Sequence, residues 1–209
     1  MASQVTATKG NLMSTKKTLA LAKMGYELLD KKRNILIREM MTLIDRANEI
    51  QRKIDDAYSE AYLALQRANI LSGFCEEIAQ TVPLENTLKL SYRSVMGVEI
   101  PIVSMQGDTN PELHYGLFNT SSPLDDAYLK FNEVKVFTTE LAEVENSVYR
   151  LANSIKKTQK RANALKNIMI PKFEADVKFI TDALEEKERE EFSRLKVIKK
   201  QKASQENAG

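Results

Sequence analysis

The sequence predicts a mainly α-helical chain in which two long segments pair as an antiparallel, left-handed two-helix coiled coil. The first observation is composition: the 209 residues are 43% hydrophobic and 29% charged, with 7% aromatic residues and no Trp, which is typical of long helices. The second is the distribution of helix-breaking residues. Glycine and proline are absent between Tyr26 and Ser72 and between Leu124 and Ile170, and four of the five prolines lie between Thr81 and Pro123. The third is an apolar heptad repeat in each uninterrupted segment.

The N-terminal segment carries the longer repeat. Alternating steps of three and four residues from Leu19 to Leu71 meet an apolar side chain at every position except Arg33. A strict 3.5-residue period over this length predicts a left-handed coiled coil. Toward its C-terminal end the seam is lined by small residues: Ala57, Ala61, Ala64 and Ala68.

The C-terminal segment repeats the pattern and then loses it. The same steps run from Val134 to Leu165, with Thr158 as the one polar position. Beyond Leu165 the apolar residues recur at a spacing of about 3.75, which relaxes or reverses a supercoil. Pro171 lies at this slip, and we expect it to bend the helix and remove one hydrogen bond, at a cost of about 3 kcal/mol or more.

Side-chain sizes suggest a register for the pair. If Ala68 faces Phe137 and Ala61 faces Val144, small side chains meet large ones, which fills the interior without overpacking. The large partners would be Phe137, Leu141, Val144 and Val148. The same register places Arg33 opposite Lys172, with Glu174 or Asp176 available to neutralise the arginine.

The connecting region predicts a β-hairpin. Leu88, Leu90 and Tyr92 alternate with polar residues, and Val98, Ile100 and Ile102 alternate again after Gly97. A lone two-stranded hairpin is marginal in water, so we expect it to rest on the helices or on a partner.

The predicted organisation therefore has four parts. A coiled-coil helix covers 10–80, and a connecting region covers 81–123, with the hairpin over about 86–104 and a loop after it. A second helix covers 124–203, with a break near Pro171, and a disordered tail covers 204–209.

Composition also narrows the function. Lys+Arg 31 against Asp+Glu 29 leaves a net charge of +2, which gives no electrostatic case for nucleic acid. No apolar run approaches the roughly 20 residues of a membrane span, so we expect no direct membrane insertion. Cys75 is the one cysteine and His114 the one histidine, and no glycine-rich phosphate loop occurs. We therefore expect no catalytic residue, no metal site, no bound cofactor and no enzymatic activity.

The segment from Glu185 to Lys200 is unusual. Glu and Lys/Arg at spacings of three and four would support a single exposed helix. Phe192, Leu195 and Ile198 nevertheless form an apolar stripe that has no predicted internal partner, which suggests an external one. The alternative is a self-stabilised overhang without a target.

Several motifs resemble the D-subunit family of the V-type and A-type rotary ATPases. In chain order they are Thr8–Leu12, Gly25–Arg33, Val95–Pro101, Lys160–Leu165, Ile170–Pro171 and Glu188–Lys196. The resemblance covers about Val5 to Lys202, and the order and spacing of the motifs make it specific. Ala162 departs from the family, in which many relatives carry Val. The short chain and its Pro/Asn-rich loop resemble bacterial members.

The resemblance implies a role as the central-stalk rotor shaft. Such a shaft couples ATP synthesis or hydrolysis in the catalytic hexamer to rotation of a membrane ring that transports H⁺ or Na⁺. The implied partners are the catalytic A and regulatory B subunits, the F subunit and a funnel-shaped subunit on the ring. The implied location is peripheral, on the cytoplasmic side of the membrane.

Two surfaces follow as hypotheses from the resemblance and the residues together. A tip that contacts the hexamer would consist of Glu188, Arg189, Phe192, Arg194, Leu195 and Lys196. A contact with the F subunit would use Leu88, Leu90, Tyr92, Val98, Ile100 and Ile102. The main alternative is a free-standing coiled-coil adaptor, which would show the same heptads but does not explain the hairpin or the slip at Pro171. A membrane-curving helical dimer is disfavoured by the charge balance.

Overall fold

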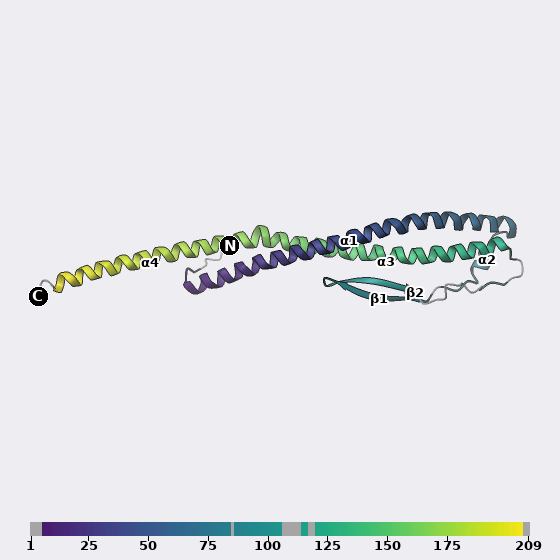
Figure 1. The fold of residues 1–209 in the computed structure, drawn as a ribbon. Helices are drawn as coiled ribbons and strands as arrows, with labels where there is room; N and C mark the ends of the chain where they lie inside the picture. Colours follow the sequence, from purple (N-terminus) through teal and green to yellow (C-terminus); the bar gives the residue numbers. More distant parts are fainter. Residues whose placement is uncertain (1–5, 85, 106–113, 117–119, 207–209) are drawn as a thin grey trace. The chain divides into compact units, whose positions relative to one another are not determined.

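The computed structural model describes residues 6–84, 86–105, 114–116 and 120–206. The elements, in chain order, are α1 (Lys9–Ser72), α2 (Glu76–Ala79), β1 (Leu88–Val95), β2 (Val98–Met105), α3 (Ser122–Ala164), the π-helical turn η1 (Leu165–Met169) and α4 (Ile170–Glu206) (Figure 1). The prediction of long N- and C-terminal helices around a central antiparallel hairpin is confirmed. Most of the loop predicted after the hairpin lies outside the described residues, as do 207–209 of the predicted tail, whereas 204–206 continue α4.

The chain forms two compact units. The terminal unit consists of residues 1–32 and 157–209, and the hairpin unit consists of residues 33–156. Each unit therefore contains a part of α1 and a part of the C-terminal helical segment, so each has its own helix pair.

In the hairpin unit, α1 packs antiparallel against α3 along the predicted seam. Every buried residue of α1 belongs to that seam: Leu36, Ile50, Ile54, Ala61, Ala64 and Ala68. One core cluster joins Ile50 and Ile54 of α1 to Val144 of α3, with Phe137, Leu141 and Val148 packed against it. Heptad positions a and d face the partner helix in every turn, so the spacing of apolar residues in the sequence was enough to identify the buried face of α1.

The predicted register is wrong. Tyr62 makes an edge-to-face contact with Phe131, with ring centroids 5.6 Å apart. The neighbouring Ala61 therefore lies beside the part of α3 near Phe131, more than one heptad before the predicted partner Val144. At the end of α1, the Ser72 hydroxyl lies 2.7 Å from that of Ser121. Phe137 accordingly packs near Ile54 and Tyr58 rather than against Ala68. Ala68 instead contacts the connecting region, in a cluster with Cys75, Tyr115 and Leu124.

The N-terminal helix also ends earlier than the predicted residue 80. Gly73 follows α1 with φ +80°, a left-handed conformation that suits glycine and stops the helix. Leu71, the last residue of the predicted seam, is exposed at this end. The short helix α2 follows after Cys75, whose side chain is buried.

In the terminal unit, the start of α1 runs antiparallel to α4. Lys23 pairs with Glu174 at 2.7 Å and Lys9 pairs with Glu188 at 2.9 Å. Glu174 thus pairs with Lys23 and not, as predicted, with Arg33. Ala162 and Ile180 are buried in this unit, and both belong to the predicted apolar stripes.

The predicted break near Pro171 is a π-helical turn rather than an interruption. The Ile170 N–H donates to the Leu165 carbonyl, five residues earlier, and α4 continues directly through Pro171. A π turn accommodates one additional residue. This accounts for the slip of the heptad frame after Leu165, since Phe173 stands one position beyond the place that strict alternation assigns.

The hairpin has a two-residue turn in which both central residues have positive φ, 51° at Met96 and 75° at Gly97. Positive φ at both positions is the signature of a type I′ turn, whose twist matches that of the flanking strands. The register pairs Val95 with Val98 and Leu88 with Met105.

Candidate partner-binding surfaces

The C-terminal end of α4 extends beyond the start of its partner helix. Lys9, the first residue of α1, pairs with Glu188 and also lies near the charge of Glu191, so the part of α4 beyond Glu191 has no α1 residue of the described chain beside it. Every side chain from Glu185 to Lys202 is exposed. We call Arg189–Lys202 the overhang.

The structure places all six predicted tip residues at or within this overhang. Phe192 and Leu195 are 69% and 65% exposed and lie one helical turn apart, and Val197 and Ile198 are exposed near them. The tip thus presents apolar side chains to solvent among charged ones.

Several charges of the tip are already paired within the chain. Glu188 binds Lys9, and this hydrogen bond and the negative charge of Glu188 raise the pKa of Lys9 above its ordinary value. Arg189 contacts Glu185 at 3.5 Å, and Arg194 contacts Glu190 at 3.8 Å, both one turn earlier. Exposed pairs of this kind contribute little to stability and can be exchanged for intermolecular pairs.

The hairpin residues predicted as one surface lie on two opposite faces. The register pairs Leu90 with Val103 and Arg93 with Ile100, and directly opposed residues share a face of the sheet. Leu88, Leu90 and Tyr92 therefore project on one face, and Val98, Ile100 and Ile102 project on the other. The sequence could not show this, because alternation within each strand does not fix the register between strands.

The Val98–Ile102 face packs against the helix pair. Ile100 is buried in a cluster with Leu36 of α1 and Leu151 of α3, and Val98 packs against this cluster. Leu88, Leu90 and Tyr92 remain exposed. On the packed face Ile102 is also 37% exposed, so the hairpin surface open to a partner consists mainly of Leu88, Leu90 and Tyr92.

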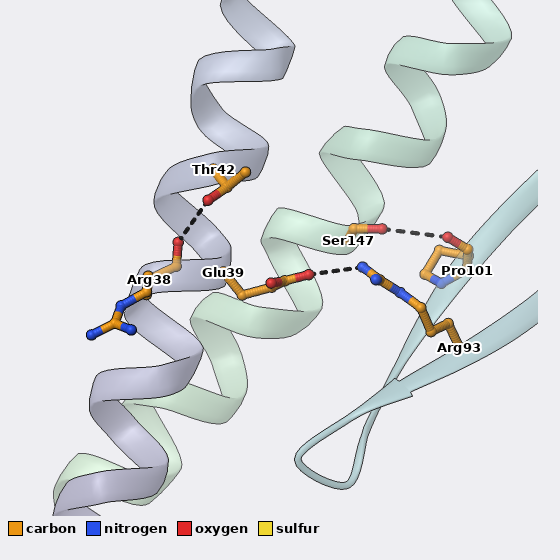
Figure 2. Close-up of polar contacts among 6 residues, drawn as sticks. All are labelled: Arg38, Glu39, Thr42, Arg93, Pro101 and Ser147. Carbon is orange, nitrogen blue, oxygen red and sulfur yellow. Dashed lines mark hydrogen bonds and ion pairs between the residues drawn. The ribbon is translucent and has the colours of Figure 1, made fainter.

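Polar side chains of α3 hold the outer edge of β2. Glu143 accepts a hydrogen bond from the Val103 N–H at 2.8 Å, and Ser147 donates to the Pro101 carbonyl at 3.5 Å. Arg150 donates to the Glu99 carbonyl at 3.3 Å and lies over the ring of Tyr92. On the α1 side, Arg93 pairs with Glu39 at 2.8 Å (Figure 2).

Sequence reasoning missed these anchoring residues. Glu143, Ser147 and Arg150 are spaced by four and three residues, so they form a polar stripe on one face of α3. Strand residues 103, 101 and 99 meet this stripe in turn. The spacing of the stripe was a signal, but its meaning depends on a contact that the sequence does not reveal.

A further apolar surface surrounds the turn between α1 and α2. Phe74 is 94% exposed, and Ile70, Leu71 and Leu84 are also largely exposed. The three exposed apolar side chains at this turn, Ile70, Leu71 and Phe74, indicate a contact surface. Sequence reasoning missed it because Leu71 continues the heptad seam.

A shallow apolar groove lies between α1 and α3 in the hairpin unit. Its lining consists of Ile44, Ala47, Asn48, Glu145, Val148, Tyr149 and Ala152. Tyr149 is exposed at its rim, so this groove is open to solvent and is not an enclosed site.

The structure adds little to a search for chemical sites. No group of three or more His, Cys, Asp or Glu suited to a metal ion occurs among the described residues. His114 is exposed, and Cys75 is buried with its thiol 3.5 Å from the Gly73 carbonyl. Within the described parts of the chain, no helix is both long and apolar enough to span a membrane.

Comparison with known proteins gives a consistent result along almost the whole chain. The family model for the D subunit of ATP synthase matches residues 11–200. The V-type ATP synthase D subunit of Thermotoga neapolitana is 42% identical over 201 residues, which cover 95% of this chain and 98% of the relative. The A-type ATP synthase D subunits of Thermococcus gammatolerans and Thermococcus kodakarensis are 39% and 38% identical, over 93% of each chain.

Proposed function

This chain belongs to the D-subunit family of ATP synthases, and we propose that it is the central-stalk rotor shaft of a V/A-type rotary ATPase. In this role it couples ATP synthesis or hydrolysis in a hexamer of catalytic A and regulatory B subunits to rotation of an ion-translocating membrane ring. The chain carries torque and performs no chemistry itself. The transported ion, H⁺ or Na⁺, does not contact it.

The observation that carries the proposal is the overhang. A rotor must touch successive catalytic interfaces that differ in state, and it can bias them only through contacts whose strength differs between states. The overhang offers such contacts, because its apolar pair Phe192 and Leu195 lies beside charged groups that are exposed and weakly engaged. Glu188, Arg189, Arg194 and Lys196 would supply the charged contacts with the hexamer.

Two other surfaces have proposed partners. The exposed hairpin face of Leu88, Leu90 and Tyr92 would meet the F subunit, while the opposite face holds the hairpin on the helices. The apolar surface around Phe74 would enter the funnel-shaped subunit on the membrane ring. In this arrangement the complex keeps the chain at the cytoplasmic side of the membrane as a peripheral component.

A cysteine cross-link tests the proposal. Arg194→Cys, in a Cys75→Ser background, is co-expressed with the A, B and F subunits and oxidised. We expect a disulfide or short bifunctional cross-link to a hexamer subunit that stops ATP turnover until it is reduced or cleaved, because a tethered shaft cannot rotate. The matched control is Arg67→Cys, which is exposed beside the α1–α2 turn and should give no link to the hexamer.

The same experiment separates the proposal from the adaptor. A chain that purifies alone and binds none of these subunits would favour a free-standing coiled-coil adaptor. A cross-link at position 194 that leaves ATP turnover unchanged would refute the assignment of the overhang as the torque-bearing tip.

A further inference from the structure

The hairpin leaves one strand edge open. β2 lies between β1 and the side chains of α3, which take up the outward N–H of Val103 and the outward carbonyls of Pro101 and Glu99. β1 is bonded by β2 on one side only, because the sheet has two strands. Its other edge carries the backbone groups that a further strand would need.

The register identifies those backbone groups. In an antiparallel pair, residues whose backbone groups point away from the partner strand stand directly opposite each other. The outward residues Val103, Pro101 and Glu99 pair with Leu90, Tyr92 and Ser94. Leu90, Tyr92 and Ser94 are spaced two residues apart along β1, and their N–H and C=O groups therefore point toward the open edge, where a further strand could bond to them.

The surroundings of the edge are exposed. Seven of the eight residues of β1 are exposed and the eighth, Val95, is half-buried. Among the described residues, no hydrogen bond is formed to the outward backbone groups of Leu90, Tyr92 or Ser94. Of the devices that protect an edge, β1 has the charged side chains of Lys89 and Arg93 but no proline and no bulge, and it is eight residues long.

Side chains beside the edge define what would bind. Leu88, Leu90 and Tyr92 form an exposed apolar row on one face, so a neighbouring strand would place apolar side chains at every second position beside them. On the other face Arg93 is paired with Glu39, while Lys89 is exposed and would favour an acidic neighbour.

We infer that β1 is an acceptor edge for strand addition, and that the incoming strand is an extended segment of another protein of the complex, apolar at alternate positions and acidic beside Lys89. The inference rests on the proposed function in one respect, since it takes the donor of the strand to be the F subunit. Main-chain hydrogen bonds give such a contact its strength, and the alternate apolar side chains give it its selectivity.

A proline placed at an outward position tests the inference directly. Leu90→Pro removes an N–H that points to the open edge and takes no part in the ladder with β2. Pro101 already occupies an outward position in β2, so a proline is compatible with this backbone. Leu90→Val is the matched control, because it keeps both the N–H and an apolar β-favouring side chain.

The measurement uses the full chain and the purified F subunit. We expect Leu90→Pro to weaken binding by about tenfold or more and Leu90→Val by about twofold or less. Hydrogen exchange should slow on binding at the outward amides of Leu90, Tyr92 and Ser94. The inward amides of Ser91 and Arg93, which bond to β2, should stay protected in both variants and so report an intact hairpin.

The outcomes are distinguishable. If the F subunit binds wild type and Leu90→Pro equally while the outward amides exchange freely, strand addition is wrong and the proposed function stands. If the F subunit does not bind the wild-type chain, its proposed contact with the hairpin fails as well. Protection of the outward amides in a dimer of this chain, without the F subunit, would identify a second copy as the donor and overturn the inference.

Discussion

At the scale of single residues, the hairpin turn contains a conformation that its side chain does not favour. Met96 has φ 51°, and a non-glycine residue in this left-handed region costs about 1–2 kcal/mol. Asn tolerates the region better, and Asn-Gly is the preferred pair for a type I′ turn. We predict that Met96→Asn slows exchange of the Ser91 and Arg93 amides by about fivefold, equivalent to about 1 kcal/mol.

The control for this prediction is Met96→Ala. It removes the exposed side chain but keeps the unfavourable φ, so exchange should not slow. Equal slowing in both variants would mean that the methionine side chain, rather than the backbone, limits the hairpin.

Tyr115 provides a second residue-scale prediction. Its hydroxyl donates to the Asp125 carboxylate at 2.7 Å, and its ring meets Tyr128 edge-to-face. Burial, followed by the hydrogen bond and charge of Asp125, raises the pKa of Tyr115 above its ordinary value of 10.0. Because the folded state holds the proton more tightly than the unfolded state, this contribution to stability is complete below pH 10 and declines above it.

We predict that Tyr115→Phe lowers the free energy of unfolding at pH 7 by about 1.5–3 kcal/mol, the value of one hydrogen bond to a charged acceptor. The difference from wild type should shrink as the pH rises above about 10. Urea unfolding followed by circular dichroism at pH 7 and pH 11 measures both quantities. A difference that grows with pH would contradict the assigned direction of the pKa shift.

At the scale of elements, the apolar periodicity correctly predicted which face of α1 is buried, whereas the side-chain sizes did not predict which residues of the two helices lie opposite each other. The buried residues of α1 all lie on the predicted seam, because a heptad pattern marks one face of a helix directly. The register was wrong because small-against-large packing can be satisfied in several heptad frames. Contacts at the ends, such as Ser72 with Ser121 and Lys23 with Glu174, distinguish these frames and have no signature in either helix alone.

The candidate surfaces likewise differ in how far the sequence predicts them. The overhang was predictable, because its apolar stripe continues beyond the part that has a partner. The division of the hairpin into a packed face and an exposed face was not, because it depends on the pairing of Leu90 with Val103 and on a polar stripe of α3 that recognises the edge of β2.

The π-helical turn leads to an element-scale prediction. Pro171 follows η1, and the turn shifts the hydrogen-bond pattern where the proline N–H is missing. A proline in a regular helix interior costs about 3 kcal/mol, so much of that cost is already relieved here. We predict that Pro171→Ala raises the free energy of unfolding of the full chain by about 1 kcal/mol, measured by urea unfolding.

The exposed Lys172→Ala variant is the matched control, since it changes a side chain but no backbone donor. It should leave the unfolding free energy within about 0.5 kcal/mol of wild type. A gain of about 3 kcal/mol for Pro171→Ala would show that the π turn relieves nothing, and a loss would show that the proline ring makes a stabilising contact.

At the scale of the whole molecule, stability and function should separate along the chain. Side chains of the seams and of the packed hairpin face are buried and stabilise each unit from within, whereas the overhang buries no side chain among its described residues. This chain belongs to the D-subunit family of ATP synthases, and the function proposed above gives the overhang a role in the complex rather than in the stability of the chain. Removing it should therefore affect the complex and leave the fold of this chain unchanged.

We predict that a chain ending at Glu188 melts within about 2 °C of wild type, because the deletion removes exposed ion pairs that contribute little. The deletion keeps the pair between Lys9 and Glu188. Under the proposed function, the same deletion in the reconstituted complex should reduce ATP-driven ion transport more than ATP hydrolysis, because catalysis would continue in the hexamer while the proposed contact with this chain is lost. Deleting only residues 203–209 is the control and should change neither quantity. Full coupling without residues 189–209 would move the torque-bearing contacts elsewhere on the chain, and a large fall in melting temperature would mean that the overhang packs within the fold.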